Sequence, residues 1–317
     1  MKPVKILVCS FVAPLLISAA HAQTVGIVTT PAGSFSNSAG SAMAKVLSER
    51  AKLRAVVQAQ ASTGFDEVES GAADFNVSNS FDATFYATGT GEYERRGPKQ
   101  TIRQIATLIP YRVAMHVKAD SDIKSIADLK GKRVSGGFNA QKTIARIIEA
   151  HLANAGLSYK DVNQVPAPNV VKQAEDFKAG KVDVMFFALG SAAIKEAAAA
   201  LGGVRVLEVN VAPEAIKRSE AFLPGAYTIT VNPDRSIEGV SKPTQLIAFD
   251  MVMISNAKVS DDIVYAVVKA IHDNKKDLVA TFPPFGLFAP EKMGKSIAGV
   301  PFHPGAARYY REIGLLK

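Results

Sequence analysis

Apolar positions along this chain follow two alternating patterns. Short apolar runs typical of buried strands are followed by stretches in which apolar residues recur every three or four positions, as on one face of a helix. The clearest unit lies at residues 128–156, where 132–135 favour a strand and a pair of glycines permits a sharp turn. An amphipathic helix is then predicted, with Asn139 as its N-cap and Gly156 as its stop. Because a helix N-terminus carries unpaired N–H groups and partial positive charge, this unit suits a bound anion.

The same order of strand, polar loop and helix recurs along the chain. Strands are predicted at 25–29, 54–60, 74–78, 163–165, 182–188 and 204–209. Helices are predicted at 41–50, 66–69, 171–179, 192–201, 262–274 and 306–313. Strands that alternate with helices indicate an α/β fold with mostly parallel sheets.

Two long extended segments stand apart from this alternation. One covers 102–117 with an interruption at 110–112, and the other covers 245–255. We interpret both as crossings between two lobes, one of which is inserted into the other. Lobe 1 is therefore predicted to comprise 23–112 plus 248–317, and lobe 2 to comprise 113–247, with a cleft between the lobes.

The first 22 residues have the pattern of a secretory signal peptide. Lys2 and Lys5 precede an apolar run at 6–17, and the tripeptide at 20–22 (AHA) fits the small-x-small cleavage rule. A membrane anchor is the weaker interpretation, because the run is shorter than the roughly 20 residues needed and contains Pro14. We therefore expect export and cleavage after residue 22.

Composition supports an exported globular protein that handles small molecules. With 48% hydrophobic and 21% charged residues in 317, the chain is large enough for two α/β domains. The only cysteine is Cys9, so a chain cleaved after residue 22 needs no disulfide in an oxidising compartment. The formal net charge of +8 is scattered rather than gathered into a stripe, which disfavours nucleic acid and leaves a mild bias toward anions.

The chain carries no complete catalytic or nucleotide-binding motif. G-x-S-x-G, the P-loop and a full G-x-G-x-x-G are all absent from the sequence. Beyond the first 22 residues, the histidines at 116, 151, 272 and 303 show no paired spacing. We predict no metal, no cofactor and no catalytic residue.

Several polar residues follow predicted strands, where α/β sheets place their ligands. Ser34, Ser36 and Asn37 suit an anion, although they serve equally well as a helix cap in a solvated loop. Asn79 and Ser80 end the third predicted strand.

Two cations are candidates for binding an acidic ligand. Arg112 lies at the first crossing and is able to clamp a carboxylate, or else to remain in solvent. Lys142 stands near a helix start, where a cation opposes the helix dipole, so it either pairs with a bound anion or extends into water.

The order of several segments resembles the TAXI family of periplasmic solute receptors that serve TRAP transporters. The most specific segment is PFHPGAARYYRE at 301–312. Supporting segments are GTGEYE at 89–94, IKSIADLKGKRVS at 123–135, DVMFF at 183–187, PGAY at 224–227 and the Val264-Tyr265 pair. The resemblance covers nearly the whole chain after residue 22.

This resemblance implies a two-lobed, type-II-like periplasmic binding protein that closes on a small organic anion. Such a protein delivers its ligand to the membrane subunits of a TRAP transporter and makes no bonds. The ligand loops depart from the family pattern, with Phe35-Ser36-Asn37 in place of Tyr-Tyr-Pro and side chains at 139–143 in place of a Gly-Ser-Gly-Thr turn. The departure predicts recognition by side chains, with the Lys142 charge directed at the cleft.

The sequence therefore predicts a receptor for a small carboxylate. The predicted ligand-binding residues are Ser34, Ser36, Asn37, Asn79, Ser80, Arg112, Asn139, Gln141, Lys142, Thr143, Phe187, Leu189, Gly190, Ser191 and Tyr227. Two rival hypotheses remain at this stage: an exported hydrolase that uses the serine-rich loops, and a ligand sensor that docks to a membrane signalling protein.

Overall fold

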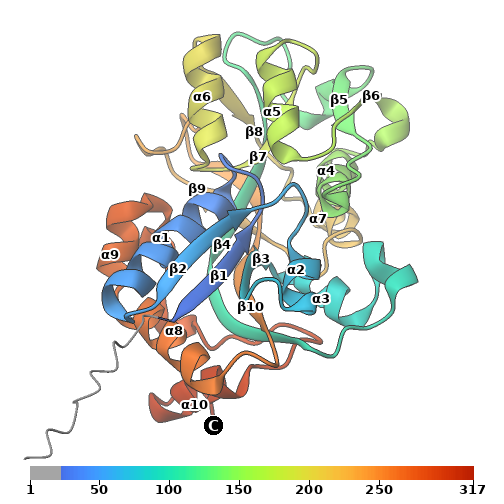
Figure 1. The fold of residues 1–317 in the computed structure, drawn as a ribbon. Coiled ribbons are helices and arrows are strands. Elements are labelled where there is room, and N and C mark those ends of the chain that lie inside the picture. The colour runs from blue at the N-terminus through green and yellow to red at the C-terminus, as the bar shows by residue number, and fades with distance from the viewer. Residues whose placement is uncertain (1–22) are drawn as a thin grey trace, which may run out of the picture.

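The structure is a computed structural model that describes residues 23–317. The predicted signal peptide at 1–22 lies outside the described residues. The chain forms an α/β fold built on one mixed sheet with helices on both sides of it (Figure 1). The sheet order is β2-β1-β3-β10-β4-β7, with β8 also paired to β4 and β9 to β10.

Two long antiparallel strands, β4 (Ile102–Lys118) and β10 (Thr244–Asn256), run through the centre of the sheet. One part of β10 pairs with β3, whereas its first residues pair with β9. The last residues of β4 pair with β7 and β8. Each long strand therefore serves two groups of elements. In Figure 1 the described elements before β4 and after β10 lie in the lower group, and most elements between them lie in the upper group.

The remaining strands are short. They are β1 (Thr24–Thr29), β2 (Arg54–Ala59), β3 (Phe75–Asn79), β7 (Met185–Ala188), β8 (Val204–Leu207) and β9 (Tyr227–Val231), with β5 (Arg133–Gly136) and β6 (Asn163–Pro166) in a separate two-stranded sheet. The predicted lobe boundaries at 112/113 and 247/248 fall inside β4 and β10. The division itself stays a prediction.

The helices are distributed along the whole described chain. They are α1 (Phe35–Arg50), α2 (Phe65–Ser70), α3 (Ser80–Thr88), α4 (Lys142–Asn154), α5 (Val170–Lys178), α6 (Ala192–Leu201), α7 (Pro213–Glu220), α8 (Asp261–Asp273), α9 (Lys275–Thr281) and α10 (Pro304–Glu312). Short 3-10 turns include η1 (Gly91–Arg96), η3 (Tyr159–Asp161) and η4 (Pro283–Leu287).

The prediction of mostly parallel sheets needs correction. Parallel pairs join β1 to β2, β1 to β3, and β5 to β6, but β4 and β10 pair with their neighbouring strands in antiparallel fashion. Strand-helix alternation predicts parallel neighbours only within each group of elements. The two crossing strands run in opposite directions through both groups, and they add the antiparallel pairs.

Three predicted boundaries also differ from the structure. The loop expected before residue 41 is largely helical, because Ser34 caps α1 and accepts a hydrogen bond from the Asn37 N–H. The predicted interruption at 110–112 is instead continuous strand in β4, and Pro110 lies opposite Asp250, beside a register shift in β10. Helix α4 begins at Lys142 with Gln141, not Asn139, as its N-cap.

The unit at 128–156 forms the strand, turn and helix expected of it. Gly137 takes a positive φ of 64° directly after β5, which a residue with a side chain rarely adopts. Ile147, Ile148 and Leu152 are buried on one face of α4. This packing fixes the direction of the helix and brings its N-terminus toward the centre of the molecule.

The C-terminal segment joins the sheet and α8 at close range. The His303 N–H donates to Gln104 O at 2.9 Å, and His303 caps α10 by accepting from the Gly305 N–H. At Gly305 the backbone of α8 approaches so closely that a Cβ would lie 2.2 Å from Asp261 O. Only glycine fits there without a backbone shift.

Gly305→Ala is expected to lower the free energy of unfolding by about 1–3 kcal/mol, because α10 must move off α8 to admit the methyl group. Urea unfolding measures this difference. Gly286→Ala is the matched control, since a Cβ at 286 meets no atom within 4 Å. Equal stability of Gly305→Ala and the parent would show that this approach imposes no constraint.

Candidate functional site

A cavity lies where the N-terminal turns of α1, α3, α4 and α5 meet the middle of β4 and the end of β7. The cavity has a volume of about 80 Å³, which is enough for several water molecules or a small organic ligand. Its apolar wall is formed by Phe35, Val77, Val113, Ile144, Ile147, Val170, Phe186, Phe187, Ala188 and Phe249. Its polar wall is formed by Thr30, Ser34, Ser36, Thr63, Ser78, Asn79, Asp82, Tyr111, Gln141 and Thr143.

Three hydroxyl groups gather at one side of the cavity. The Thr30 hydroxyl donates to Ser34 Oγ at 2.7 Å and lies 2.5 Å from Ser36 Oγ. Ser34 also caps α1, which confirms the cap interpretation of this residue, and its side chain lines the cavity as well. The N–H groups of the first helical turn have no intrahelical acceptor, and they leave partial positive charge at this side.

Two side-chain amides in the cavity wall have NH₂ groups without a hydrogen-bond partner among residues 23–317. Asn79 Oδ1 accepts from the Asp82 N–H at 2.8 Å, and Gln141 Oε1 accepts from the Val170 N–H at 2.9 Å. Because a backbone N–H can only donate, it identifies the amide oxygen in each case, and the other terminal atom must be nitrogen. Within residues 23–317 neither NH₂ group has a hydrogen-bond acceptor, although both residues line the cavity. Asn79 and Gln141 therefore offer free donors to a ligand.

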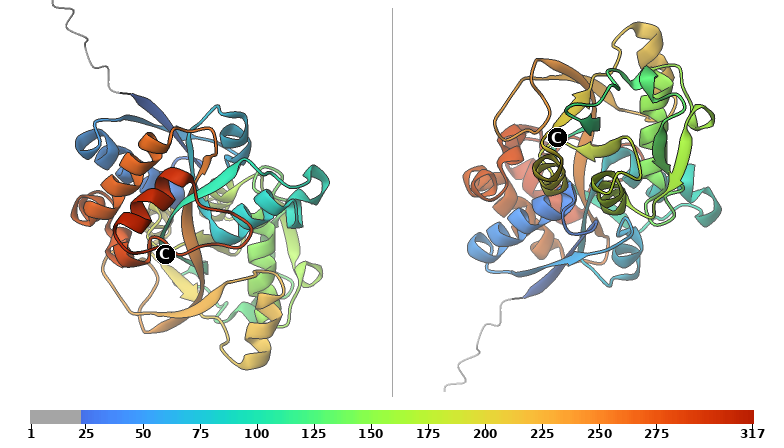
Figure 2. Two further views of the ribbon diagram at one scale, coloured as in Figure 1. Left: turned by 90° about the horizontal axis from the view of Figure 1, so that it is seen from below. Right: turned by 90° about the horizontal axis from the view of Figure 1, so that it is seen from above.

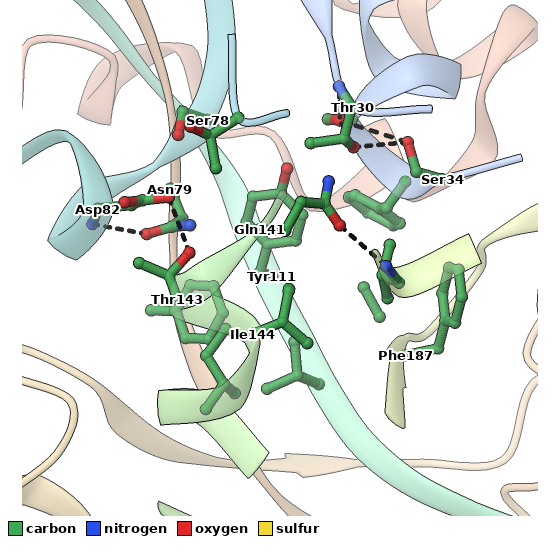
Figure 3. A pocket seen from close by; sticks show the side chains of 18 of the residues that line it. Thr30, Ser34, Ser78, Asn79, Asp82, Tyr111, Gln141, Thr143, Ile144 and Phe187 are labelled. Atoms are coloured by element: carbon green, nitrogen blue, oxygen red, sulfur yellow. Dashed lines mark hydrogen bonds between the residues drawn. The ribbon is translucent and has the colours of Figure 1, made fainter. Parts of the chain in front are cut away.

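Tyr111 and Ser78 add further hydroxyl groups to the cavity wall. Burial raises the pKa of Tyr111, so its phenol remains protonated and able to donate. In Figure 3, Thr30 and Ser34 lie on one side, Asn79, Asp82 and Thr143 on the other, and Gln141 and Tyr111 between them.

Asp82 is the acidic residue of the cavity wall. Its side chain is 1% exposed, and Oδ2 accepts from the Thr143 hydroxyl at 3.0 Å. Burial raises the pKa of Asp82 to about 7; hydrogen bonding by Tyr93 and Thr143 opposes the rise and the Glu92 charge adds to it. The Tyr93 hydroxyl pairs with Thr63 Oγ1 at 3.2 Å, and Asp82 Oδ1 is left without a partner of good hydrogen-bond geometry among the described residues.

The described residues that line the cavity include no lysine, arginine or histidine. A ligand there meets hydroxyl groups, amide NH₂ groups, helix N-termini and one buried acid. The wall thus offers neutral donors and dipoles rather than a basic side chain.

The structure brings together six of the fifteen predicted ligand-binding residues. Those that line the cavity are Ser34, Ser36, Asn79, Gln141, Thr143 and Phe187. Asn37 and Ser80 belong to the first turns of α1 and α3 but are not in its wall, and Asn37 Nδ2 donates to Thr29 Oγ1 at 3.0 Å.

The other seven predicted residues do not line the cavity either. Asn139 and Lys142 are exposed, so the Lys142 charge is not directed at the cavity. Arg112 and Gly190 line a separate hollow beside Asp234, and Tyr227 lines another and donates to Asp250 at 3.1 Å. The remaining two, Leu189 and Ser191, are buried in the protein.

Sequence reasoning missed several wall residues. Ser78 directly precedes Asn79 at the end of β3. The preference of ligands for strand ends in α/β sheets was therefore sufficient to predict it. Tyr111 and Asp82 carry no local signal, because they belong to the middle of a strand and the first turn of a helix.

Residues 23–317 lack two further features. No cluster of three or more His, Cys, Asp or Glu side chains in this part of the chain has the arrangement of a metal site. No helix in the same range has the length and apolar character needed to span a membrane.

Solved structures with a similar fold include periplasmic proteins. A structure described as a periplasmic transporter aligns with a TM-score of 0.60 and 11% identity, over 93% of this chain and 94% of that chain. A protein from Bordetella bronchiseptica RB50 aligns with a TM-score of 0.55 and 12% identity, over 93% of this chain and 99% of that chain. The fold is that of two-lobed periplasmic binding proteins, in agreement with the predicted fold class. Residues 27–314 match the NMT1-like family, and the chain belongs to that family.

Proposed function

We propose that this chain is a periplasmic solute-binding receptor that captures a small organic anion and delivers it to a TRAP-type membrane transporter. The observation that carries the ligand class is the pair of free NH₂ groups on Asn79 and Gln141, whose oxygens are already occupied by backbone N–H groups. A carboxylate accepts hydrogen bonds and donates none, so it complements a cavity that offers donors.

Helix N-termini supply the electrostatic part of this proposal. Helices α1, α3 and α4 each contribute first-turn residues to the cavity wall, and their dipoles favour negative charge there. Asp82 opposes an anion only when it is ionised. With a pKa near 7 it is largely protonated in mildly acidic solution, where we expect the ligand to bind best.

The TRAP partner and export rest on the resemblance to the TAXI family, and the similarity in fold to a periplasmic transporter supports a role in transport. The chain would then act without catalysis. The rival hydrolase hypothesis predicts turnover of a bound ester or amide. The sensor hypothesis predicts binding to a signalling protein and no ligand transfer to a permease.

A thermal-shift screen tests the ligand class. Small mono- and dicarboxylates are compared with the corresponding neutral amides at millimolar concentration. A ligand with micromolar affinity should stabilise the protein by roughly 4 kcal/mol, and its amide by much less. Stabilisation by amides but not by acids, or by no compound in the panel, would contradict the proposal.

A further inference from the structure

Much of the cavity wall is buried in this conformation. Ser34, Asp82, Gln141, Thr143 and Phe187 come from four separate elements or their caps, and each is at most 2% exposed. The wall is therefore tightly packed at these five side chains. Movement of one of these elements would widen the entrance to the cavity for a ligand.

Helix α4 forms part of the cavity wall and makes hydrogen bonds to different segments at its two ends. Its C-terminal residue Asn154 is bonded to α7 and to the segment before it, with Nδ2 donating to Asn210 O at 2.9 Å and to Ser219 Oγ at 3.1 Å. Its N-terminal half instead contacts α3 and η1. In both views of Figure 2 the green helix α4 stands beside the cyan segment that carries η1.

Two polar links join α4 to the α3–η1 segment. The Thr143 hydroxyl donates to Asp82 Oδ2 at 3.0 Å, and Arg146 Nε donates to Glu92 Oε1 at 2.6 Å. Thr143 and Arg146 are three residues apart and share one face of the helix. Moving α4 away from the cavity breaks both links.

The Arg146–Glu92 pair is the stronger of the two. Its side chains are 27% and 15% exposed, so water screens their attraction less than that of a surface pair. The guanidinium also lies 5.1 Å from the ring centroid of Phe85 on α3. Neither Arg146 nor Glu92 lines the cavity, so their role is separable from contact with the ligand.

We propose that Arg146 and Glu92 form a clasp that holds α4 over the cavity and controls its opening. The two residues are positioning residues, since they act on the cavity wall rather than on the ligand. The clasp requires opposite charges at both positions. The proposal goes beyond the proposed function, because it concerns the opening of the cavity whatever ligand is bound.

Pulsed electron-electron double resonance on the unliganded full chain tests the clasp. Cys9 is the only cysteine, so Cys9→Ser gives a clean background for spin labels at Arg95→Cys and Lys160→Cys. Both positions are exposed, on η1 and on η3. In the parent we expect one narrow distance distribution. In Arg146→Gln, and equally in Glu92→Gln, we expect a second population at longer distance.

Arg133→Gln is the matched control, because it breaks the Arg133–Asp183 ion pair, whose residues both lie within predicted lobe 2. Its distribution should match that of the parent. The double variant Glu92→Gln/Arg146→Gln should be no more open than either single variant, since both remove one interaction. A parent distribution as broad as that of Arg146→Gln, or the same broadening in the control, would overturn the clasp. These outcomes do not depend on any ligand, so they leave the proposed function to its own test.

Discussion

Asn79→Asp is expected to weaken binding of a carboxylate ligand by roughly 100-fold or more. The substitution keeps an oxygen that can accept from the Asp82 N–H and cap α3, but it replaces the free NH₂ group by a negatively charged oxygen. A lost donor and a like charge next to the ligand together cost several kcal/mol. Isothermal titration with an acid identified in the screen measures the change.

Asn169→Asp provides the matched control for this prediction. Asn169 caps α5 by accepting from the Lys172 N–H at 2.9 Å, and it does not line the cavity. It therefore receives the same charge in the same capping role, and its ligand affinity should stay close to that of the parent. If Asn79→Asp binds the acid as tightly as Asn169→Asp does, the free NH₂ of Asn79 does not contact the carboxylate.

The pH dependence of stability is expected to change sharply in Asp82→Asn. Burial lowers the pKa of His116 to about 4, and it raises the pKa of Asp82 to about 7. His116 therefore contributes stability above about pH 6.5 that is lost as the pH falls through 4. Asp82 has the opposite sign: its contribution is present below about pH 3.8 and is lost as the pH rises through 7.

The two contributions oppose each other between about pH 4 and 6.5, and each is on the order of 3 kcal/mol there. Asp82→Asn removes the Asp82 contribution and leaves that of His116. Between about pH 6.5 and 4, the free energy of unfolding of this variant should therefore fall by about 3 kcal/mol more than that of the parent. Urea unfolding at several pH values between 4 and 6.5 measures both slopes. His116→Gln should shift the slope the other way. Parallel curves for Asp82→Asn and the parent would show that Asp82 titrates normally in the folded protein.

Local sequence signals located some helix starts of this site and missed others. Helix α5 begins at Val170, one residue before the predicted 171, whereas α1 begins at Phe35 rather than at 41, and α3 was not predicted. Ser34 and Asn79 are residues that favour N-caps, and both act as caps in the cavity wall. The strand-turn-helix unit at 128–156 also formed as predicted, although its helix begins two residues after the position implied by Asn139 as its cap. Caps and turns depend on a few neighbouring residues, and this is why the sequence reveals them.

The predicted cations show the limit of that reasoning. Lys142 and Arg112 are the basic residues nearest to the expected ligand in the chain, yet the structure places both outside the cavity. Lys142 is the first residue of α4, and packing of Ile147 and Ile148 on the inner face leaves it on the exposed side. Which side of a helix faces a cavity depends on what packs against it, and spacing alone leaves that choice open.

The sequence by itself determined the α/β class, the two long extended segments and the polar character of the strand ends, because these follow from local periodicity and residue type. Only the tertiary structure decided which polar groups meet. Asp82 is buried because Thr143, 61 residues away, packs against it, and Gln141 offers its NH₂ because the Val170 N–H occupies its oxygen. Burial and the choice of hydrogen-bond partner are set by contacts between distant segments, and those contacts turn a set of polar residues into a cavity lined with free donors.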